Sequence, residues 1–283
     1  MSNSLTTPKY IDLLEELNED ENVEILNPLS NDLSVMRQSL LFSGLEAISY
    51  NINRKNADLK LFEFGKSYHQ INNENIEKKH LGVFVTGNQN SENWNVQPQK
   101  SNFFFLKAIV ERLFERLGIQ NLQTSPTENS IFLEGLQLNQ GKNTLVELGV
   151  VNPKTAKKFS INQSVLYAEF NWSLIIENLK AKKITLKEIP KFQPVRRDFA
   201  LLINKSVSFK EIYDLAIKQE KKLLKDVNLF DVYEGENLPE DKKSYAVSFT
   251  LLDEKKTLTD KQIDKVMNKL QKSFESELGA ELR

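Results

Sequence analysis

Hydrophobic and polar positions between residues 191 and 283 follow the order strand, helix, strand, strand, helix, strand. The run at 197–203 is short and apolar, and apolar and polar residues alternate at 244–253. Both features are typical of strands, and the run at 227–235 is interpreted in the same way. A turn rich in Pro, Glu, Asp and Lys at 238–243 joins the last two runs into a hairpin.

Two helices are predicted between these strands. Ser208 and Glu211 form a capping box that starts the first, and Thr259 and Gln262 form another that starts the second. Gly279 ends the second helix in a left-handed conformation, after which the last residues return as an edge strand. The apolar stripes that define the helices are Ile212, Leu215, Ala216, Gln219 and Leu223 in the first and Ile263, Val266, Met267, Leu270, Phe274 and Leu278 in the second. The simplest fold for this order is a ferredoxin-like βαββαβ domain with both helices on one face of a four-stranded antiparallel sheet.

The N-terminal part predicts an α+β domain in which helices flank one large sheet. Its helices alternate with apolar strands that read as buried on both faces. Ser173 is expected to cap a short helix that ends near Leu179. The other predicted elements are helices marked by Leu41, Leu45, Ile48 and Ile52 and by Phe103, Leu106, Val110, Leu113 and Leu117, the latter closed by Gly118, and strands at 59–65, 81–87, 145–151 and 165–172.

The segment 179–197 divides the chain. It is rich in lysine, contains Pro190 and Pro194, and interrupts the preceding helical pattern, as a connector does. We therefore expect two domains, residues 1–185 and residues 191–283.

Composition narrows the class of protein and the kind of partner. The 283 residues are 40% hydrophobic and 27% charged, which is typical of a globular protein. There is no cysteine, no apolar run approaching twenty residues and no signal-peptide core, so a cytoplasmic, non-membrane protein is expected. From Lys191 onward, 18 Lys and Arg face 17 Asp and Glu, so any contact with nucleic acid must come from a local cluster.

Few residues in the N-terminal part are candidates for a catalytic, metal-binding or ligand-binding role. His69 and His80 are the only histidines, and strand-end or surface positions are favoured over a metal site or a general base. Lys66 could hold a phosphate, although a solvated lysine is favoured. The run Phe103–Phe105 exceeds what one helical stripe needs; the excess ring is assigned to the core in preference to a partner contact. No catalytic or metal-binding residue is predicted.

Several multi-residue segments, in order along nearly the whole chain, resemble one family. The chain is similar to the C-terminal third of the bacterial phenylalanyl-tRNA synthetase β chain. The segments that carry the resemblance are NPLSNDLSVMRQSLLFSGLEAISYNINR (27–54), LFEFGKSYH (61–69), VRRDFALLI (195–203), LFDVYEG (229–235), KKSYAVSFTLLDEKKTLTD (242–260) and the closing GAELR.

The resemblance implies a class II synthetase-like antiparallel sheet domain followed by a ferredoxin-fold anticodon-binding domain. It also implies a fragment of a longer β chain that pairs with a catalytic α chain in a heterotetramer of two α and two β chains. A class II active site needs arginines on the adenylate phosphates and acidic residues for Mg²⁺. The segments that match these motifs, 64–69 and 165–172, lack the expected arginines. The resemblance thus implies that ATP and Mg²⁺ are used by the complex, with no cofactor in this chain.

For the last domain, the resemblance implies binding of the tRNA-Phe anticodon. Proteins read unpaired RNA by stacking bases on aromatic rings and holding phosphates with basic groups. Against this, Arg197 and Asp198 could form only a local ion pair, and Phe230 could belong to the core. The candidate RNA-binding residues are Arg196, Arg197, Phe230, Tyr233, Lys242, Lys243 and Ser244.

Two functions remain open at this point. The first is the β-subunit part of a phenylalanine–tRNA ligase, which supports ATP-dependent charging of tRNA-Phe. The second is a free-standing noncatalytic RNA- or protein-interaction module of synthetase-like fold. A third, weaker hypothesis, an ATP-using enzyme in its own right, is disfavoured by the missing arginines.

Overall fold

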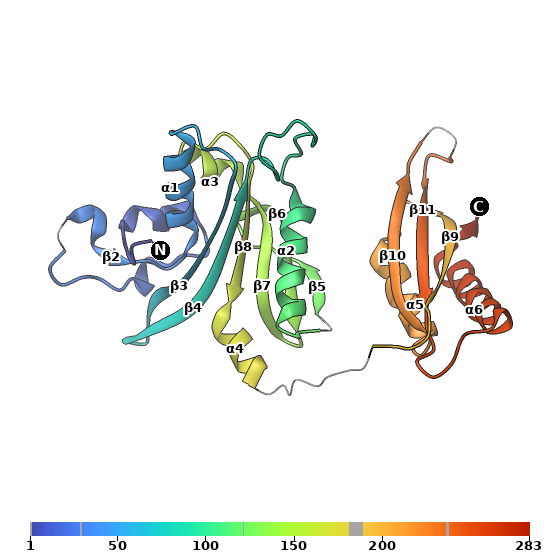
Figure 1. The fold of residues 1–283 in the computed structure, drawn as a ribbon. Coiled ribbons are helices and arrows are strands. Elements are labelled where there is room, and N and C mark those ends of the chain that lie inside the picture. Colours follow the sequence, from blue (N-terminus) through green and yellow to red (C-terminus); the bar gives the residue numbers. More distant parts are fainter. Residues whose placement is uncertain (1, 29, 121, 181–188, 236–237) are drawn as a thin grey trace. The chain divides into compact units, whose positions relative to one another are not determined.

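The chain folds as two compact units, Met1–Ile184 and Thr185–Arg283 (Figure 1). The computed structural model describes residues 2–28, 30–120, 122–180, 189–235 and 238–283. Part of the expected connector, residues 181–188, therefore lies outside the described residues. None of the helices in the described ranges is long and apolar enough to cross a membrane.

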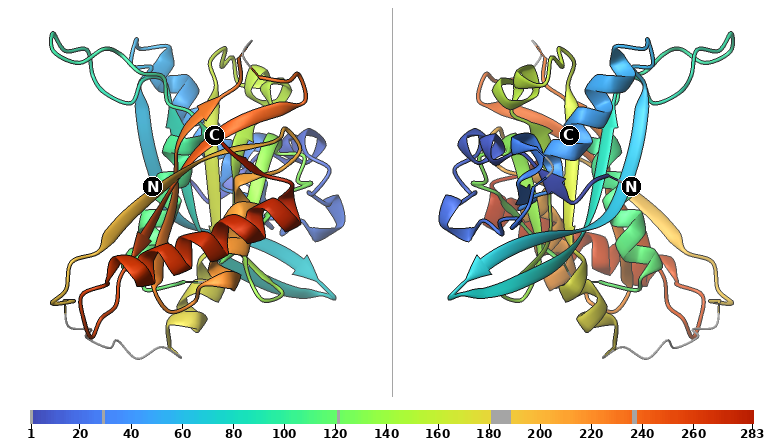
Figure 2. Two further views of the ribbon diagram at one scale, coloured as in Figure 1. Left: turned by 90° about the vertical axis from the view of Figure 1, so that its right-hand side faces the viewer. Right: turned by 90° about the vertical axis from the view of Figure 1, so that its left-hand side faces the viewer.

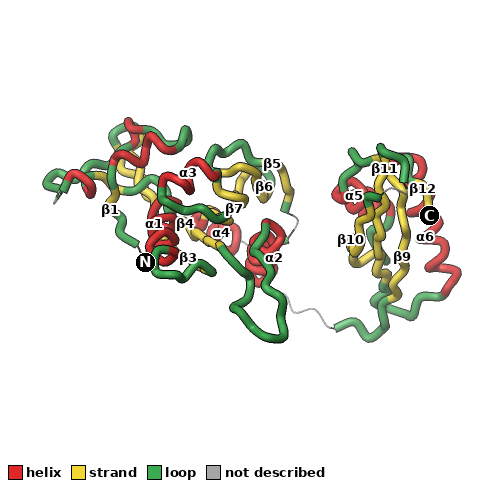
Figure 3. Tube along the Cα trace, turned by 90° about the horizontal axis from the view of Figure 1, so that it is seen from above, coloured by secondary structure: helices red, strands yellow, loops and turns green. Residues whose placement is uncertain are grey.

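One antiparallel sheet forms the centre of the N-terminal unit, and Figure 3 shows its strands in yellow. Its six strands follow the order β3-β4-β8-β7-β6-β5 (Figure 1). Its strands are β3 (Leu59–Ile71), β4 (Glu74–Thr86), β5 (Gln123–Pro126), β6 (Phe132–Gln140), β7 (Asn143–Val151) and β8 (Val165–Asn171). The helices are α1 (Leu41–Ile52), α2 (Phe103–Arg116), α3 (Pro153–Lys158) and α4 (Trp172–Lys180). Before α1 come the short strands β1 (Leu5–Thr6) and β2 (Val35–Met36) and the 3₁₀ turns η1 (Pro8–Leu13), η2 (Glu19–Glu21) and η3 (Asn31–Leu33).

Helices cover both faces of this sheet, as the sequence predicted. On one face, called the α1 face, Phe84 and Tyr167 pack with residues of α1 and α3. On the other, called the α2 face, Phe170 packs with residues of α2 and α4. Alternation of side chains along each strand separates the two cores.

Gly44 allows α1 to approach the sheet closely. A Cβ atom at this position would lie 2.1 Å from the ring of Phe84, so a larger residue would push the helix off the sheet. The close approach sets the depth at which the segment before α1, including Arg37, meets β3.

Two predictions for the N-terminal unit need correction, and two strands were not predicted. Ser173 is inside α4; the amide of Leu174 instead donates to Asn171 Oδ1 at 3.1 Å, so Asn171 supplies the cap. Phe104 is 75% exposed, so the excess ring of the phenylalanine run is not in the core. The strands β5 (QTSP) and β6 (FLEGLQLNQ) were not predicted, because β5 has no apolar run and polar residues and a glycine interrupt the apolar residues of β6.

The C-terminal unit has the predicted ferredoxin-like fold. Its sheet order is β10-β11-β9-β12, and all pairs are antiparallel. Its elements are β9 (Val195–Asn204), α5 (Phe209–Gln219), β10 (Leu224–Tyr233), β11 (Lys242–Leu251), α6 (Asp260–Leu278) and β12 (Glu281–Leu282). Both capping boxes and the left-handed Gly279, with φ 60°, are confirmed. Leu223, predicted within the first helix, lies beyond its end but still packs on the core.

Both helices of this unit cover the same face of its sheet, and α6 crosses the strands on that face (Figure 2, left). The alternating residues Tyr245, Val247, Phe249 and Leu251 of β11 point into this core, as predicted. Neither α5 nor α6 lies over the opposite side of the sheet, which is called the open face.

Candidate functional site

The open face of the C-terminal unit brings together four of the seven predicted RNA-binding residues. Strand register places Tyr233 opposite Ser244, and Ser244 alternates with the core residues of β11. Arg196 lies opposite Thr250 on the same face. Phe230, at an irregularity in β10, contacts Arg196 and therefore joins this group.

Arg196 and Phe230 form the most defined contact of the open face. The guanidinium carbon of Arg196 lies 5.0 Å from the centroid of the Phe230 ring, within the range of a cation–π interaction. The Arg196 Nε also donates to Asp198 Oδ1 at 2.9 Å. Because Phe230 is 49% exposed, it is not a core residue and one side of its ring is available for stacking.

Small side chains line the central strand of the open face. Ser244, Ala246, Ser248 and Thr250 lie on this side of β11, because the residues between them belong to the core. Tyr233 is 41% exposed on the neighbouring edge strand. Ser244 and Ser248 are only 9% and 5% exposed, so the surface that RNA could reach on this face consists mainly of the exposed rings of Phe230 and Tyr233 and of Arg196.

The structure places the three other predicted residues differently. Arg197 shares its side of β9 with the core, and its guanidinium lies 4.0 Å from Asp260, the first residue of α6. Lys243 is 7% exposed, and its ammonium donates to the carbonyl of Lys205 at 2.9 Å. Lys242 forms an ion pair with Glu281.

A row of carboxylates crosses the α1 face of the N-terminal unit. Register places Glu63 opposite Gly82, Gly82 opposite Glu169, and Glu169 opposite Glu147. Each carboxylate has a partner: Glu147 accepts from Thr127 and Asn129, and Glu169 accepts from the hydroxyl of Tyr167 at 2.9 Å.

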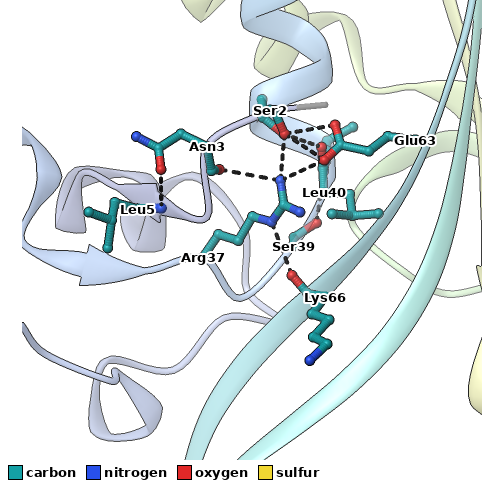
Figure 4. Close-up of polar contacts among 10 residues, drawn as sticks. Ser2, Asn3, Leu5, Arg37, Ser39, Leu40, Glu63 and Lys66 are labelled. Atoms are coloured by element: carbon teal, nitrogen blue, oxygen red, sulfur yellow. Dashed lines mark hydrogen bonds and ion pairs between the residues drawn. The ribbon is translucent and has the colours of Figure 1, made fainter.

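Arg37 neutralises Glu63, and its guanidinium is held from several sides (Figure 4). Its Nη1 lies 3.1 Å from Glu63 Oε1 and donates to the Ser2 hydroxyl, and its Nε donates to the carbonyl of Lys66 at 3.0 Å. Ser2 in turn donates to Glu63. Burial acts to raise the pKa of Glu63, but the hydrogen bond from Ser2 and the charge of Arg37 outweigh it and hold the pKa below 4.5.

The two histidines meet at Ser67, which corrects the expectation of simple strand-end histidines. His69 Nε2 and His80 Nε2 lie 3.0 and 2.9 Å from the Ser67 hydroxyl, and their Nδ1 atoms lie 2.9 Å from Glu21 and 3.0 Å from Glu169. Ser67 has one proton for two ring nitrogens, so at least one imidazole must present an N–H to it. The cluster links η2, β3, β4 and β8.

Replacing His69 by glutamine is expected to flatten the pH dependence of stability between pH 7 and 5. Burial lowers the pKa of His69 below 6.5, against the raising effect of Glu21. The unfolded chain therefore binds this proton more readily, and the native state loses stability as pH falls below 6.5. Glutamine keeps a donor for Ser67 but does not titrate. Urea unfolding followed by tryptophan fluorescence at several pH values measures the effect; parallel pH profiles for both proteins would contradict it.

Charged side chains that the structure describes on the α1 face already have partners. Glu63, Glu147 and Glu169 point onto it, and its buried cation, Arg37, is already paired. Lys66, the other candidate for a phosphate, forms an ion pair with Glu77. Among the described residues, no group of three or more His, Asp or Glu side chains could hold a metal ion.

Two family models match the chain in tandem. Residues 1–172 match a model described as the phenylalanyl tRNA synthetase beta chain CLM domain. Residues 190–283 match a model described as the ferredoxin-fold anticodon binding domain.

Similar proteins are found among curated sequences and solved structures. The phenylalanine–tRNA ligase beta subunits of Bacteroides fragilis and Porphyromonas gingivalis are 48% and 40% identical to this chain over its whole length. That of Clostridium acetobutylicum is 37% identical over 99% of the chain. The chain spans 36%, 36% and 35% of these relatives, about a third of their length. A solved pyrrolysyl tRNA synthetase from Desulfitobacterium hafniense is 13% identical with a TM-score of 0.50, covering 64% of this chain and 62% of that chain, and shows a likeness of fold.

Proposed function

The chain belongs to the family of phenylalanine–tRNA ligase beta subunits, and from this premise we propose that it supports the charging of tRNA-Phe without catalysing it. In this proposal the C-terminal unit binds the anticodon of tRNA-Phe. The N-terminal unit assembles with a catalytic alpha subunit, in a heterotetramer of two alpha and two beta chains. The complex, in the cytoplasm, uses ATP and Mg²⁺.

One observation carries the RNA-binding part of the proposal. A domain that matches the anticodon-binding family leaves one sheet face open, and on that face Arg196 lies over the exposed ring of Phe230. A guanidinium and an aromatic ring side by side offer the phosphate contact and the stacking surface that single-stranded RNA needs. The neighbouring Tyr233 provides a second ring for an adjacent base.

The charge of the α1 face supports a noncatalytic N-terminal unit. ATP is polyanionic, and Glu63, Glu147 and Glu169 would repel its phosphates unless additional cations were present. Arg37 already serves Glu63 and three other acceptors, so releasing it for a phosphate would leave a buried carboxylate without its cation. We expect no ATP–pyrophosphate exchange with phenylalanine on this chain alone; exchange above background would contradict the noncatalytic assignment.

A titration with tRNA tests anticodon binding directly. Labelled tRNA-Phe with its native anticodon is compared with tRNA-Phe carrying altered anticodon bases, at two salt concentrations. Stacking on a ring accepts any base, so selectivity must come from hydrogen bonds to base edges. One good base-edge contact discriminates by about 1–3 kcal/mol, so altered bases should weaken binding several-fold at both salt concentrations. Affinity that is indifferent to the anticodon and no stronger than that of a salt-matched control RNA would contradict the assignment.

A further inference from the structure

The proposed function uses no residue of the α2 face of the N-terminal unit, and this face has an apolar groove. It lies between the edge of the sheet, at β3 and β4, and helix α2, with a volume of about 460 Å³. Phe62 and Phe64 of β3 are 72% and 48% exposed, and they contact each other edge to face with ring centroids 6.3 Å apart. Leu81 and Val83 of β4 continue the floor.

The groove exists because the helices cover only part of this face. α2 packs on β7 and β8, while α4 contacts β4 near the end of the sheet where Trp172 meets Phe64. Leu81 and Val85 of β4 are 4% and 0% exposed, so the uncovered part of this face lies mainly over β3, at Phe62 and Phe64.

The wall that α2 contributes is amphipathic. Ile109 and Leu113 face the groove, and Arg112 and Arg116 stand one turn apart along its rim. Both arginines are exposed, and neither forms an ion pair with any described residue. At the β3 side Lys60 also lines the groove. An occupant that fits this groove therefore needs an apolar surface against the floor and acidic groups beside the basic rim.

We propose that this groove binds an amphipathic helix of a partner protein, with an apolar stripe on Phe62, Phe64, Ile109 and Leu113 and acidic residues beside Arg112 and Arg116. Apolar groups at positions i, i+3, i+4 and i+7 of such a helix would cover the two phenylalanine rings. Carboxylates on its flank would pair with the two arginines, which set its direction and register. The contact is independent of tRNA, because it uses the N-terminal unit and none of the open-face residues.

A designed peptide tests the proposal. The probe is a labelled helix of about 18 residues, or five turns, with leucines on one stripe and glutamates on the flank. Its binding to this chain is followed by fluorescence anisotropy against two peptides, one of scrambled order and one with lysines in place of glutamates. We expect the glutamate helix to bind at least about tenfold more tightly than either, since burying one exposed phenylalanine alone accounts for about that factor.

Matched variants distinguish binding in the groove from non-specific hydrophobic binding elsewhere on the surface. Phe62→Ser should weaken binding about tenfold, whereas Phe104→Ser, which removes a ring that is 75% exposed outside the groove, should not. The double variant Arg112→Glu, Arg116→Glu reverses the charge of the rim. It should bind the lysine helix more tightly than the glutamate helix. These side chains are exposed, so unfolding curves should match the parent protein and confirm that the variants fold.

Three results would overturn the proposal. The first is equal affinity for the scrambled peptide, and the second is equal loss in the Phe62→Ser and Phe104→Ser variants. The third is binding to vesicles containing anionic lipid, abolished by Phe62→Ser, when the glutamate helix does not bind. That result would assign the groove to a membrane surface instead of a protein helix.

Discussion

Arg37→Met is expected to lower the free energy of unfolding of the N-terminal unit by about 3–5 kcal/mol. The side chains of Arg37 and Glu63 are 5% and 14% exposed, so methionine would leave a desolvated carboxylate without its cation. It would also remove the donor to the carbonyl of Lys66, which ties the segment before α1 to β3. Methionine fills much of the volume of the arginine stem, so most of the decrease in the free energy of unfolding should come from the lost charge interaction with Glu63.

Tryptophan fluorescence during urea unfolding measures this loss in one unit alone. The only two tryptophans, Trp94 and Trp172, are both in the N-terminal unit. Lys9→Met is the matched control, because Lys9 pairs with Asp32 while their side chains are 79% and 75% exposed. An exposed pair contributes about 0–1 kcal/mol, so equal effects of the two substitutions would contradict a buried charge network.

The pH dependence of the same variant checks the cause. In the native protein Glu63 has a pKa below 4.5, so its stabilising effect is present above that value and is lost as pH falls. Without Arg37, one of the groups that lower the pKa of Glu63 is lost, so that pKa rises and the carboxylate is protonated at a higher pH than in the parent protein. The difference in stability between the parent protein and the variant should therefore be largest near pH 7 and shrink toward pH 4.

The C-terminal fold was predictable because its signals are local. Capping boxes at Ser208 and Thr259 and a glycine at 279 mark helix ends through hydrogen bonds between neighbours in sequence. The faces of the RNA-binding candidates could also have been assigned. Arg197 is two residues from Phe199, and Lys243 is two residues from Tyr245. Residues two apart in a strand share a face, so both basic residues belong to the helix-covered side of the sheet.

The polar network of the N-terminal unit could not be predicted from patterns in the sequence. Arg37 and Glu63 are far apart along the chain, and only the pairing of β3 with the segment before α1 brings them together. The carboxylates beside His69 and His80 come from η2 and β8, which a local search for spacing does not connect. A lone arginine in the largely apolar run 35–42 was the one signal that pointed to a buried charge.

Phe230→Ala is expected to weaken binding of tRNA-Phe by about 1–3 kcal/mol, roughly 5- to 150-fold. The ring is 49% exposed and supports the guanidinium of Arg196, so alanine would remove a stacking surface and leave that arginine less ordered. Arg196→Ala should reduce affinity as well, with a shallower salt dependence because one phosphate contact is lost. The measurement is a titration of labelled tRNA at several salt concentrations.

Variants at three other positions test whether the loss of affinity is specific to the open face. Two of these positions are neighbours of Arg196, and the third is an aromatic residue on another face. Tyr213→Ala removes a ring that is 40% exposed on α5 and should leave affinity unchanged. Asp198→Asn frees Arg196 from its ion pair and should strengthen binding, because phosphate then has no competitor for the guanidinium. Arg197 points to the helix-covered side, so its replacement reports whether RNA extends beyond the open face. If Tyr213→Ala weakened binding as much as Phe230→Ala, the RNA would have to contact a surface other than the open face. Weaker binding of the Asp198→Asn variant would contradict a phosphate contact by Arg196 in competition with Asp198.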